Sequence, residues 1–237
     1  MRTVPYGTTT RLPVTSSNAA PSDSFTERQQ AVLAVALRLL VDGGEGALTT
    51  AGLARAANCS KESLYKWFGD REGLLAAVVS FQASKVRTLA PGRDAPGPEA
   101  FRAHLQVFAG DLLDVLCGET SLALNRLAIG QASREGSRLG HLVLERGRRT
   151  IEARARALLD VGRSRGHLAF EDTGGAYATL YGLVVRDLHV RMLLGDPAPG
   201  PAERRALADR AVDEFLRLLG AAGDETARAT GRGQGTP

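Results

Sequence analysis

The chain has 237 residues, of which 43% are hydrophobic and 24% charged, and its formal net charge is +4. These values are ordinary for a globular protein large enough to bury a core, and the small basic excess favours a polyanionic partner without establishing one. The apolar runs are too short for a membrane span and the N-terminus lacks the apolar core of a signal peptide, so we expect a cytoplasmic protein with no membrane partner.

The N-terminal segment predicts an arm followed by a helix. Residues 1–24 are rich in Thr, Ser, Pro and Ala and have almost no apolar periodicity, which is typical of a flexible arm. A helix is expected to begin after Ser24 or Thr26 and to run to about Val41, because its apolar residues recur at helical spacing. The following Asp-Gly-Gly predicts its end.

The next stretch, TTAGLARAANCSKESLYKWF from Thr49 to Phe68, predicts two short helices joined by a tight turn. Thr49 and Ser60 are suitable N-caps, and Asn58 tolerates the left-handed backbone that such a turn requires. In the second helix Leu64 and Phe68 fall on an inward face, whereas the other face is polar and carries two lysines. A helix-turn-helix needs this division, because one side packs on partner helices while the other enters a major groove of DNA.

A further helix is predicted from the N-cap Asp70 to about Leu89, and PGRDAPGP from Pro91 to Pro98 interrupts the chain and marks a domain boundary. The remainder is again helical by period. We expect helices ending at Gly118, over about 122–131, over 137–165, over 173–194 and over 202–219, followed by a disordered tail at 221–237. The prediction is an all-α chain of about nine helices, with a DNA-binding domain at 25–90 and a regulatory domain at 91–220.

Two long stretches of the sequence resemble a known family. The run ALRLLVDGGEGALTTAGLARAANCSKESLYKWFGDREGLL, within Val32 to Leu75, resembles the N-terminal domain of the TetR/AcrR family of bacterial transcriptional regulators. In the second half, RLAIGQASREGSRLGHLVLERGRRTIEARARALLDVGRSRGHL followed by LYGLVVRDLHVRMLLG looks like the AefR-like type of regulatory domain. The resemblance implies an all-α homodimer that binds a palindromic operator in double-stranded DNA, usually represses, and releases DNA when a small effector enters the C-terminal domain.

The resemblance also implies roles at the DNA. Thr49, Ser60, Tyr65 and Arg71 match family positions that hold the phosphate backbone, which sets affinity and register. The candidates for reaching base edges are Lys61, Glu62, Ser63 and Lys66; the two lysines either donate to guanine acceptors or contact phosphate only. Glu62 stands where many members carry Gly, and it either accepts a hydrogen bond from a cytosine amine or excludes wrong sequences by repelling phosphate.

The regulatory domain supplies candidates for a ligand cavity and a dimer interface. The residues favoured for lining a cavity are Phe101, His104, Leu105, Phe108, Leu112, Leu127, Gln131, Tyr177 and Tyr181, with Asn125 and His141 as further polar candidates. For any single apolar one of these, ordinary core packing at helical spacing is the better explanation. The family pairs its last two helices with those of a second copy. The corresponding dimer candidates are Val184, Val185, Leu188, Leu207, Ala211, Phe215 and Leu218.

No catalytic centre, metal site or cofactor is expected. Cys59 and Cys117 have no metal-ligand spacing and are interpreted as buried core residues, and the four histidines are too scattered to form a catalytic group. Two alternatives stay open: an activator or ligand-independent regulator of the same family, and a helical enzyme or small-molecule carrier with a vestigial helix-turn-helix. Salt-dependent DNA binding would favour the regulator, and turnover of a metabolite without DNA affinity would favour the enzyme.

Overall fold

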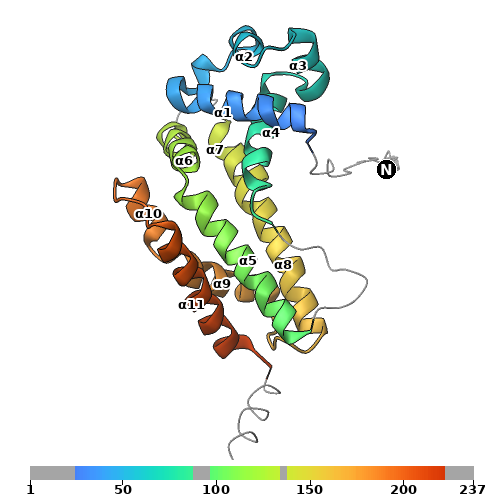
Figure 1. Cartoon of the computed structure of the whole chain (residues 1–237), viewed down its shortest axis with the longest axis vertical. Helices are drawn as coiled ribbons and strands as arrows, with labels where there is room; N and C mark the ends of the chain where they lie inside the picture. Colours follow the sequence, from blue (N-terminus) through green and yellow to red (C-terminus); the bar gives the residue numbers. More distant parts are fainter. Residues whose placement is uncertain (1–24, 88–96, 134–137, 222–237) are drawn as a thin grey trace, which may run out of the picture.

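A computed structural model describes residues 25–87, 97–133 and 138–221, and this part of the chain is helical apart from one β-bridge between Leu168 and Gly220 (Figure 1). The elements are α1 (Glu27–Ala47), α2 (Thr50–Ala56), α3 (Lys61–Phe68), α4 (Arg71–Ala83), α5 (Pro98–Cys117), α6 (Glu119–Gln131), α7 (Leu139–Leu142), the π-helix η1 (Val143–Arg148), α8 (Arg149–Ser164), α9 (Thr173–Val185), α10 (Leu188–Leu193) and α11 (Pro201–Leu219). The all-α prediction is confirmed. The arm at 1–24 and the tail at 222–237 lie outside the described residues, as does most of the proposed linker.

Helix α4 ends at Ala83 instead of continuing to about Leu89 as predicted, because turn residues follow it. Two other helices differ from the predicted ones for local backbone reasons. Helix α1 does not end near Val41 but continues to Ala47 across a kink at Gly44, whose φ of 69° is accessible to glycine at little cost. The single helix predicted over 173–194 is divided into α9 and α10, because Arg186 has a φ of 48° and ends α9. Since α7, η1 and α8 follow one another without a break, the described residues form ten separate helical rods.

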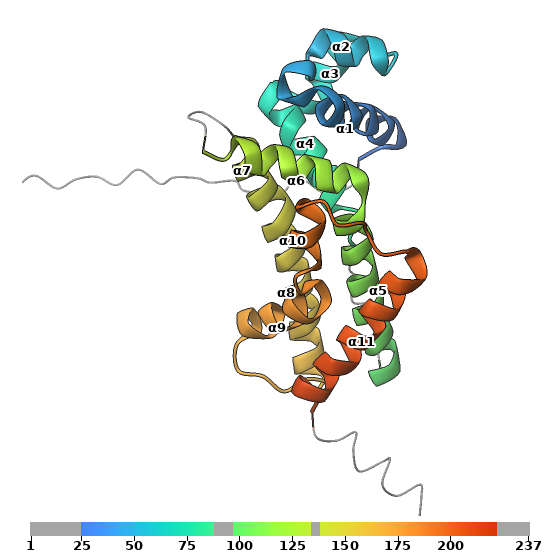
Figure 2. The same ribbon diagram turned by 90° about the vertical axis from the view of Figure 1, so that its left-hand side faces the viewer.

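The N-terminal helices pack around a core that extends into the second half of the chain. The N-terminal core contains fully buried residues of α1 such as Leu33 and Leu40, together with Leu64 of α3 and Val78 of α4. Leu124 and Ala128 of α6 and Leu139 and Leu142 of α7 belong to the same core. Figure 2 shows α6 and α7 lying directly against the α1–α4 unit. The α1–α4 unit is therefore attached to the helices that follow it through a shared apolar interface.

The C-terminal core is formed by the long helices of the regulatory domain. Helices α5 and α8 run lengthwise, and α9 and α11 pack beside them (Figures 1 and 2). Its largest fully buried side chains include Phe101 and Phe108 of α5 and Phe215 of α11. Among the described helices none is long and apolar enough to cross a membrane.

Candidate DNA-binding surface and ligand cavity

The helix-turn-helix lies at one end of the molecule, and α2 and α3 each begin at a side-chain cap (Figure 1). The Thr49 hydroxyl accepts a hydrogen bond from the Gly52 amide at 3.0 Å and begins α2. The Ser60 hydroxyl accepts from the Ser63 amide at 3.0 Å and begins α3. Both predicted N-caps are confirmed, and each satisfies a backbone amide that would otherwise have no helical partner.

The turn between α2 and α3 is fixed by a residue that sequence reasoning missed. Asn58 has a φ of 48°, as predicted for the turn. The guanidinium of Arg28, on α1, donates to the carbonyl oxygens of Ala57 at 3.1 Å and Asn58 at 2.7 Å. Because carbonyls at the end of α2 lack helical donors, this cation stabilises the helix end and ties the turn to α1. The signal in the sequence was a lone arginine on a polar helix face, which looks like any solvated residue.

The remaining polar residues of α3 face away from the N-terminal core. Lys61, Glu62 and Lys66 are exposed, and Tyr65 is 57% exposed although it is a large aromatic residue. Leu64 and Phe68 on the opposite face are buried, as predicted. An exposed polar strip with two cations and an unburied aromatic ring can reach phosphates and base edges in a major groove.

Arg71 and Trp67 occupy structural positions beside this strip. The Arg71 guanidinium donates to the Glu45 carbonyl at 2.7 Å and lies 3.5 Å from its carboxylate, which links the start of α4 to the end of α1. Half of the Arg71 side chain remains exposed, so a phosphate can still approach it. Trp67 is half-buried against the N-terminal core and packs edge-on against Phe68. Asp70 caps α4 through the Gly73 amide, as predicted.

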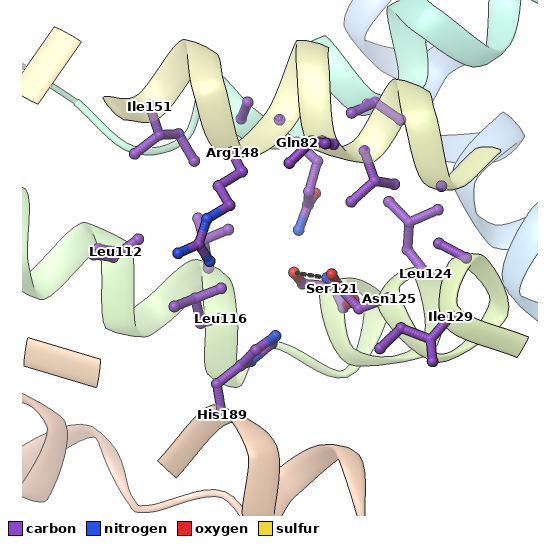
Figure 3. Close-up of a pocket in the computed structure, with 18 of the residues that line it drawn as sticks. Gln82, Leu112, Leu116, Ser121, Leu124, Asn125, Ile129, Arg148, Ile151 and His189 are labelled. Carbon is purple, nitrogen blue, oxygen red and sulfur yellow. Dashed lines mark hydrogen bonds between the residues drawn. The ribbon is translucent and has the colours of Figure 1, made fainter. Parts of the chain in front are cut away.

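A cavity of about 340 Å³ lies between α4 and the regulatory helices. Val79, Gln82 and Ala83 of α4 form one wall, and the others come from α5, α6, the α7–η1–α8 rod, α9 and α10. The lining is mostly apolar, with a few polar side chains; Figure 3 shows Arg148, Gln82, Ser121, Asn125 and His189 directed toward it. A mostly apolar cavity with a few convergent polar groups is the usual form of a small-molecule site. One of its walls belongs to the helix that continues from the DNA-binding unit.

Polar groups gather at one end of the cavity. Arg148 donates to the Tyr181 hydroxyl at 3.0 Å, and its guanidinium lies 4.4 Å from the centre of that ring. The Tyr177 hydroxyl and His189 Nδ1 are buried and have no hydrogen-bond partner. Burial raises the pKa of Tyr177 to about 12, and burial, followed by the nearby Arg148 charge, lowers the pKa of His189. Both side chains are therefore neutral at pH 7.

The structure brings three of the predicted ligand residues together in the cavity wall. Leu112, Tyr177 and Tyr181 line it, and so does Asn125. Phe101, Leu105 and Phe108 lie instead in the C-terminal core, because the first half of α5 is covered by other helices and only its second half borders the cavity. Leu127 packs on the N-terminal core, and the residues His104, Gln131 and His141 are not part of the wall. Sequence reasoning missed Gln82, Ser121, Arg148 and His189; Gln82 and Ser121 carried the only signal, a polar residue within an apolar helical face.

The dimer candidates divide in a similar way. Val184, Val185, Ala211 and Phe215 are at most 4% exposed and belong to the C-terminal core, so they pack within the protomer instead of facing a second copy. Leu188 and Leu207 are half-buried, whereas Leu218 is 65% exposed. An apolar stripe on a helix does not by itself distinguish an internal face from an interface, which is why four of the seven candidates fall on the inner sides of α9 and α11.

The described residues contain no group of three or more His, Cys, Asp or Glu side chains placed to hold a metal ion. Cys59 is half-buried against the N-terminal core. Cys117 is buried, and this burial raises the pKa of its thiol, which keeps it in the less reactive protonated form.

Comparisons with known proteins agree with this architecture. Residues 32–78 match the family of bacterial regulatory proteins of the tetR type, and residues 103–221 match the C-terminal domain of AefR-like transcriptional repressors. A crystal structure of a TetR transcriptional regulator from Agrobacterium tumefaciens is 61% identical, covers 85% of this chain and 99% of its own, and superimposes with a TM-score of 0.72. The search of curated proteins gave no match.

More distant solved structures share the fold. One is a TetR-family regulator from Mesorhizobium loti, 24% identical over 82% of this chain and 97% of its own, with a TM-score of 0.61. Another, described as the flavonoid-responsive regulator FrrA, is 24% identical over 83% of this chain and 98% of its own, with a TM-score of 0.59. These matches are to transcriptional regulators and not to enzymes.

Proposed function

The chain belongs to the TetR family of bacterial transcriptional regulators, with a regulatory domain of the AefR-like repressor type, and from this premise we propose that it is a homodimeric repressor released from a palindromic operator by a small ligand. Such a protein acts on the chromosome, so the proposal places it in the cytoplasm. The observation that carries it is the capped helix α3, whose exposed strip of Lys61, Glu62, Tyr65 and Lys66 projects at the end of the molecule.

The proposed reading of DNA divides the strip by chemistry. Hydroxyl groups and the Arg71 guanidinium are suited to phosphate, which fixes the position of α3 in the groove. Lys61 and Lys66 can donate to guanine, and Glu62 can accept from cytosine. The hydrogen bonds from Arg28 to the α2–α3 turn support DNA reading by α3, because they fix the orientation of α3 relative to α1 in the DNA-free protein.

The proposed dimer uses the outward faces of α9 and α11. On α9 the exposed positions Gly175, Ala178 and Gly182 are small, which allows another helix to approach closely, and α11 contributes the exposed Leu218. A two-fold axis through this face would present two copies of α3 to DNA, and a symmetric dimer requires a palindromic site.

The proposed release by ligand follows from the position of the cavity. A molecule that fills it would contact α4 directly through Val79, Gln82 and Ala83. A change in how α4 packs would alter the position of α3, which rests on α4 through the N-terminal core. Linkage then requires that operator DNA weaken ligand binding by the same factor as the ligand weakens DNA binding. The response of FrrA to flavonoids supports only the view that this fold accommodates such regulation.

The DNA assignment is tested with operator fragments that the wild-type protein selects from a random-sequence pool. We expect Tyr65→Ala and Lys66→Ala each to weaken binding by about 1 to 3 kcal/mol, the scale of one lost groove contact. Arg165→Ala is the matched control, because it removes one exposed cation at the distal end of α8. Unchanged affinity of the folded Tyr65→Ala/Lys66→Ala double variant at matched salt would show that α3 is not the reading helix.

The dimer assignment is tested with Gly182→Arg. A Cβ added at the exposed Gly182 would meet nothing within 4 Å in the protomer, so the variant should fold while its guanidinium blocks the second copy. Gly130→Arg on α6 is equally open and serves as the control. Sedimentation should show monomers for Gly182→Arg and dimers for Gly130→Arg. A dimer of undiminished stability in Gly182→Arg would exclude this face.

A further inference from the structure

The polar end of the cavity contains one cation that has no internal acidic partner. On the same rod, Glu145 pairs with Arg149 and Glu152 pairs with Arg156. Arg148 forms no ion pair within the described part of the chain. Its guanidinium is nevertheless held in place, because it stacks on the Tyr181 ring and donates to the Tyr181 hydroxyl. A positioned arginine without a carboxylate partner is suited to an anion from outside the chain.

A buried hydroxyl group lies close to this cation. Tyr177 is only 5% exposed and its ring centre lies 5.9 Å from that of Tyr181, yet its hydroxyl donates to nothing. A buried polar group without a partner costs stability, so a site that keeps one is suited to a ligand that supplies the acceptor. His189 Nδ1 is also unpartnered and the ring is neutral, so Arg148 provides the one full positive charge at this end.

The rest of the cavity is suited to an apolar body. Leu112, Leu124, Val143 and Ile151 form part of the wall. Two further lining residues, Ile129 and Leu144, are 61% and 40% exposed, so the mouth is also apolar. Exposed apolar side chains beside a cavity are typical of a route by which an apolar molecule enters.

We propose that the ligand of this cavity is an apolar monocarboxylic acid whose carboxylate binds the Arg148 guanidinium and accepts a hydrogen bond from the Tyr177 hydroxyl. The inference rests on the proposed function and names the ligand class of the same cavity. A guanidinium presents paired donors that match the two oxygens of a carboxylate, and a single cation neutralises one negative charge. An amine would be repelled by Arg148, and a phosphate dianion would bring a second charge for which this end has no cation.

The test uses 2-naphthoate and its neutral isostere 2-naphthamide, whose bicyclic body is smaller than the cavity. Isothermal titration of the full-length protein without DNA should give 2-naphthoate at least about tenfold tighter binding, as expected for one charge-assisted hydrogen bond. Arg148→Gln should abolish this preference, and Tyr177→Phe should reduce it while leaving the fold intact. Arg149→Gln is the matched control, because Arg149 is next in sequence but is paired with Glu145 and does not line the cavity.

Equal binding of the acid and the amide, tighter binding of the amide, or no measurable binding of 2-naphthoate at millimolar concentration would overturn the inference. A preference for the acid that survives in Arg148→Gln would also overturn it, because the carboxylate would then lie elsewhere. These results are separate from the proposed function, which is measured by operator binding. If only neutral molecules release the operator, the ligand class is wrong and the repressor proposal holds. If 2-naphthoate binds tightly but has no effect on DNA binding, the ligand class holds and release of DNA by this ligand is wrong.

Discussion

Replacement of Gly162 by Ala tests how tightly the C-terminal core is filled. Gly162 is buried on α8, and a Cβ added to it would lie 2.2 Å from Phe101 Cζ and within 3 Å of both Cε atoms of that ring. Ordinary carbon contacts are about 3.5 to 4.0 Å, so the ring or the helix would have to move by more than about 1 Å. Phe101 is 1% exposed and packs against the His167 ring, which leaves it little room to move.

The magnitude follows from two opposing effects. Ala is favoured over Gly within a helix by about 1 kcal/mol, whereas overpacking of a filled core costs about 1 to 3 kcal/mol and more when the clash is severe. Since this contact is much shorter than ordinary ones, we expect a net loss of about 2 kcal/mol. For a chain of this size that corresponds to a melting temperature lower by about 4 to 8 °C. Thermal unfolding at fixed protomer concentration measures it, because dimerisation also affects the midpoint.

Two further variants make the result decisive. Phe101→Leu removes the three ring atoms that would collide, so Gly162→Ala should be neutral or stabilising in that background. Gly110→Ala on α5 is the control, because its Cβ would meet nothing within 4 Å and only the helix preference should act. The reasoning is refuted if Gly162→Ala melts at or above the wild-type temperature, or if its destabilisation persists in Phe101→Leu.

Three other predictions concern the turn, the cavity and α4. Arg28→Met removes both bonds to the α2–α3 turn, so we expect about 1 to 2 kcal/mol lower stability and faster amide exchange at 57–60; unchanged exchange would contradict this. Folding lowers the pKa of His189, so below about pH 6.5 the unfolded chain binds a proton at this residue that the folded chain does not. The free energy of unfolding should therefore decrease as the pH drops below about 6.5. Urea melts of His189→Asn should lack the share of this decrease that His189 causes. At Gly147 of η1 a Cβ would lie 3.4 Å from Val79 of α4, so Gly147→Ala should fold normally. The larger side chain of Gly147→Phe should displace α4 and weaken operator binding without any ligand. Equal operator affinity of the two variants would contradict a coupling between the position of α4 and DNA binding.

The helix-turn-helix could be predicted because its signals are local. Thr49, Ser60 and Asp70 are caps within hydrogen-bond reach of their own helices, and Asn58 supplies the turn by its own backbone preference. The break at Arg186 could not be predicted, because arginine has no preference for the positive φ that it adopts there.

The cavity could not be predicted from helical periodicity. Phe101 and Leu112 lie on the same apolar face of α5, yet one is buried in the C-terminal core and the other borders the cavity. Periodicity identifies which face of a helix is covered, but whether that space is filled depends on helices far away in sequence. For the same reason Val184 and Phe215 were expected at a dimer interface, although they pack within the protomer.

The π-helix η1 gives the rod α7–η1–α8 a change of phase. Its hydrogen bonds reach one residue further than those of an α-helix, so it holds one residue more than a regular helix of the same pitch would need. Loss of that surplus would rotate α7 against α8 by about 100°, the turn that one residue makes in an α-helix. η1 packs on α4 and supplies Leu144, Gly147 and Arg148 to the cavity wall. The hydrogen-bond pattern of this single turn therefore determines both the shape of the cavity and the position of α4, the helix that leads to the DNA-binding unit.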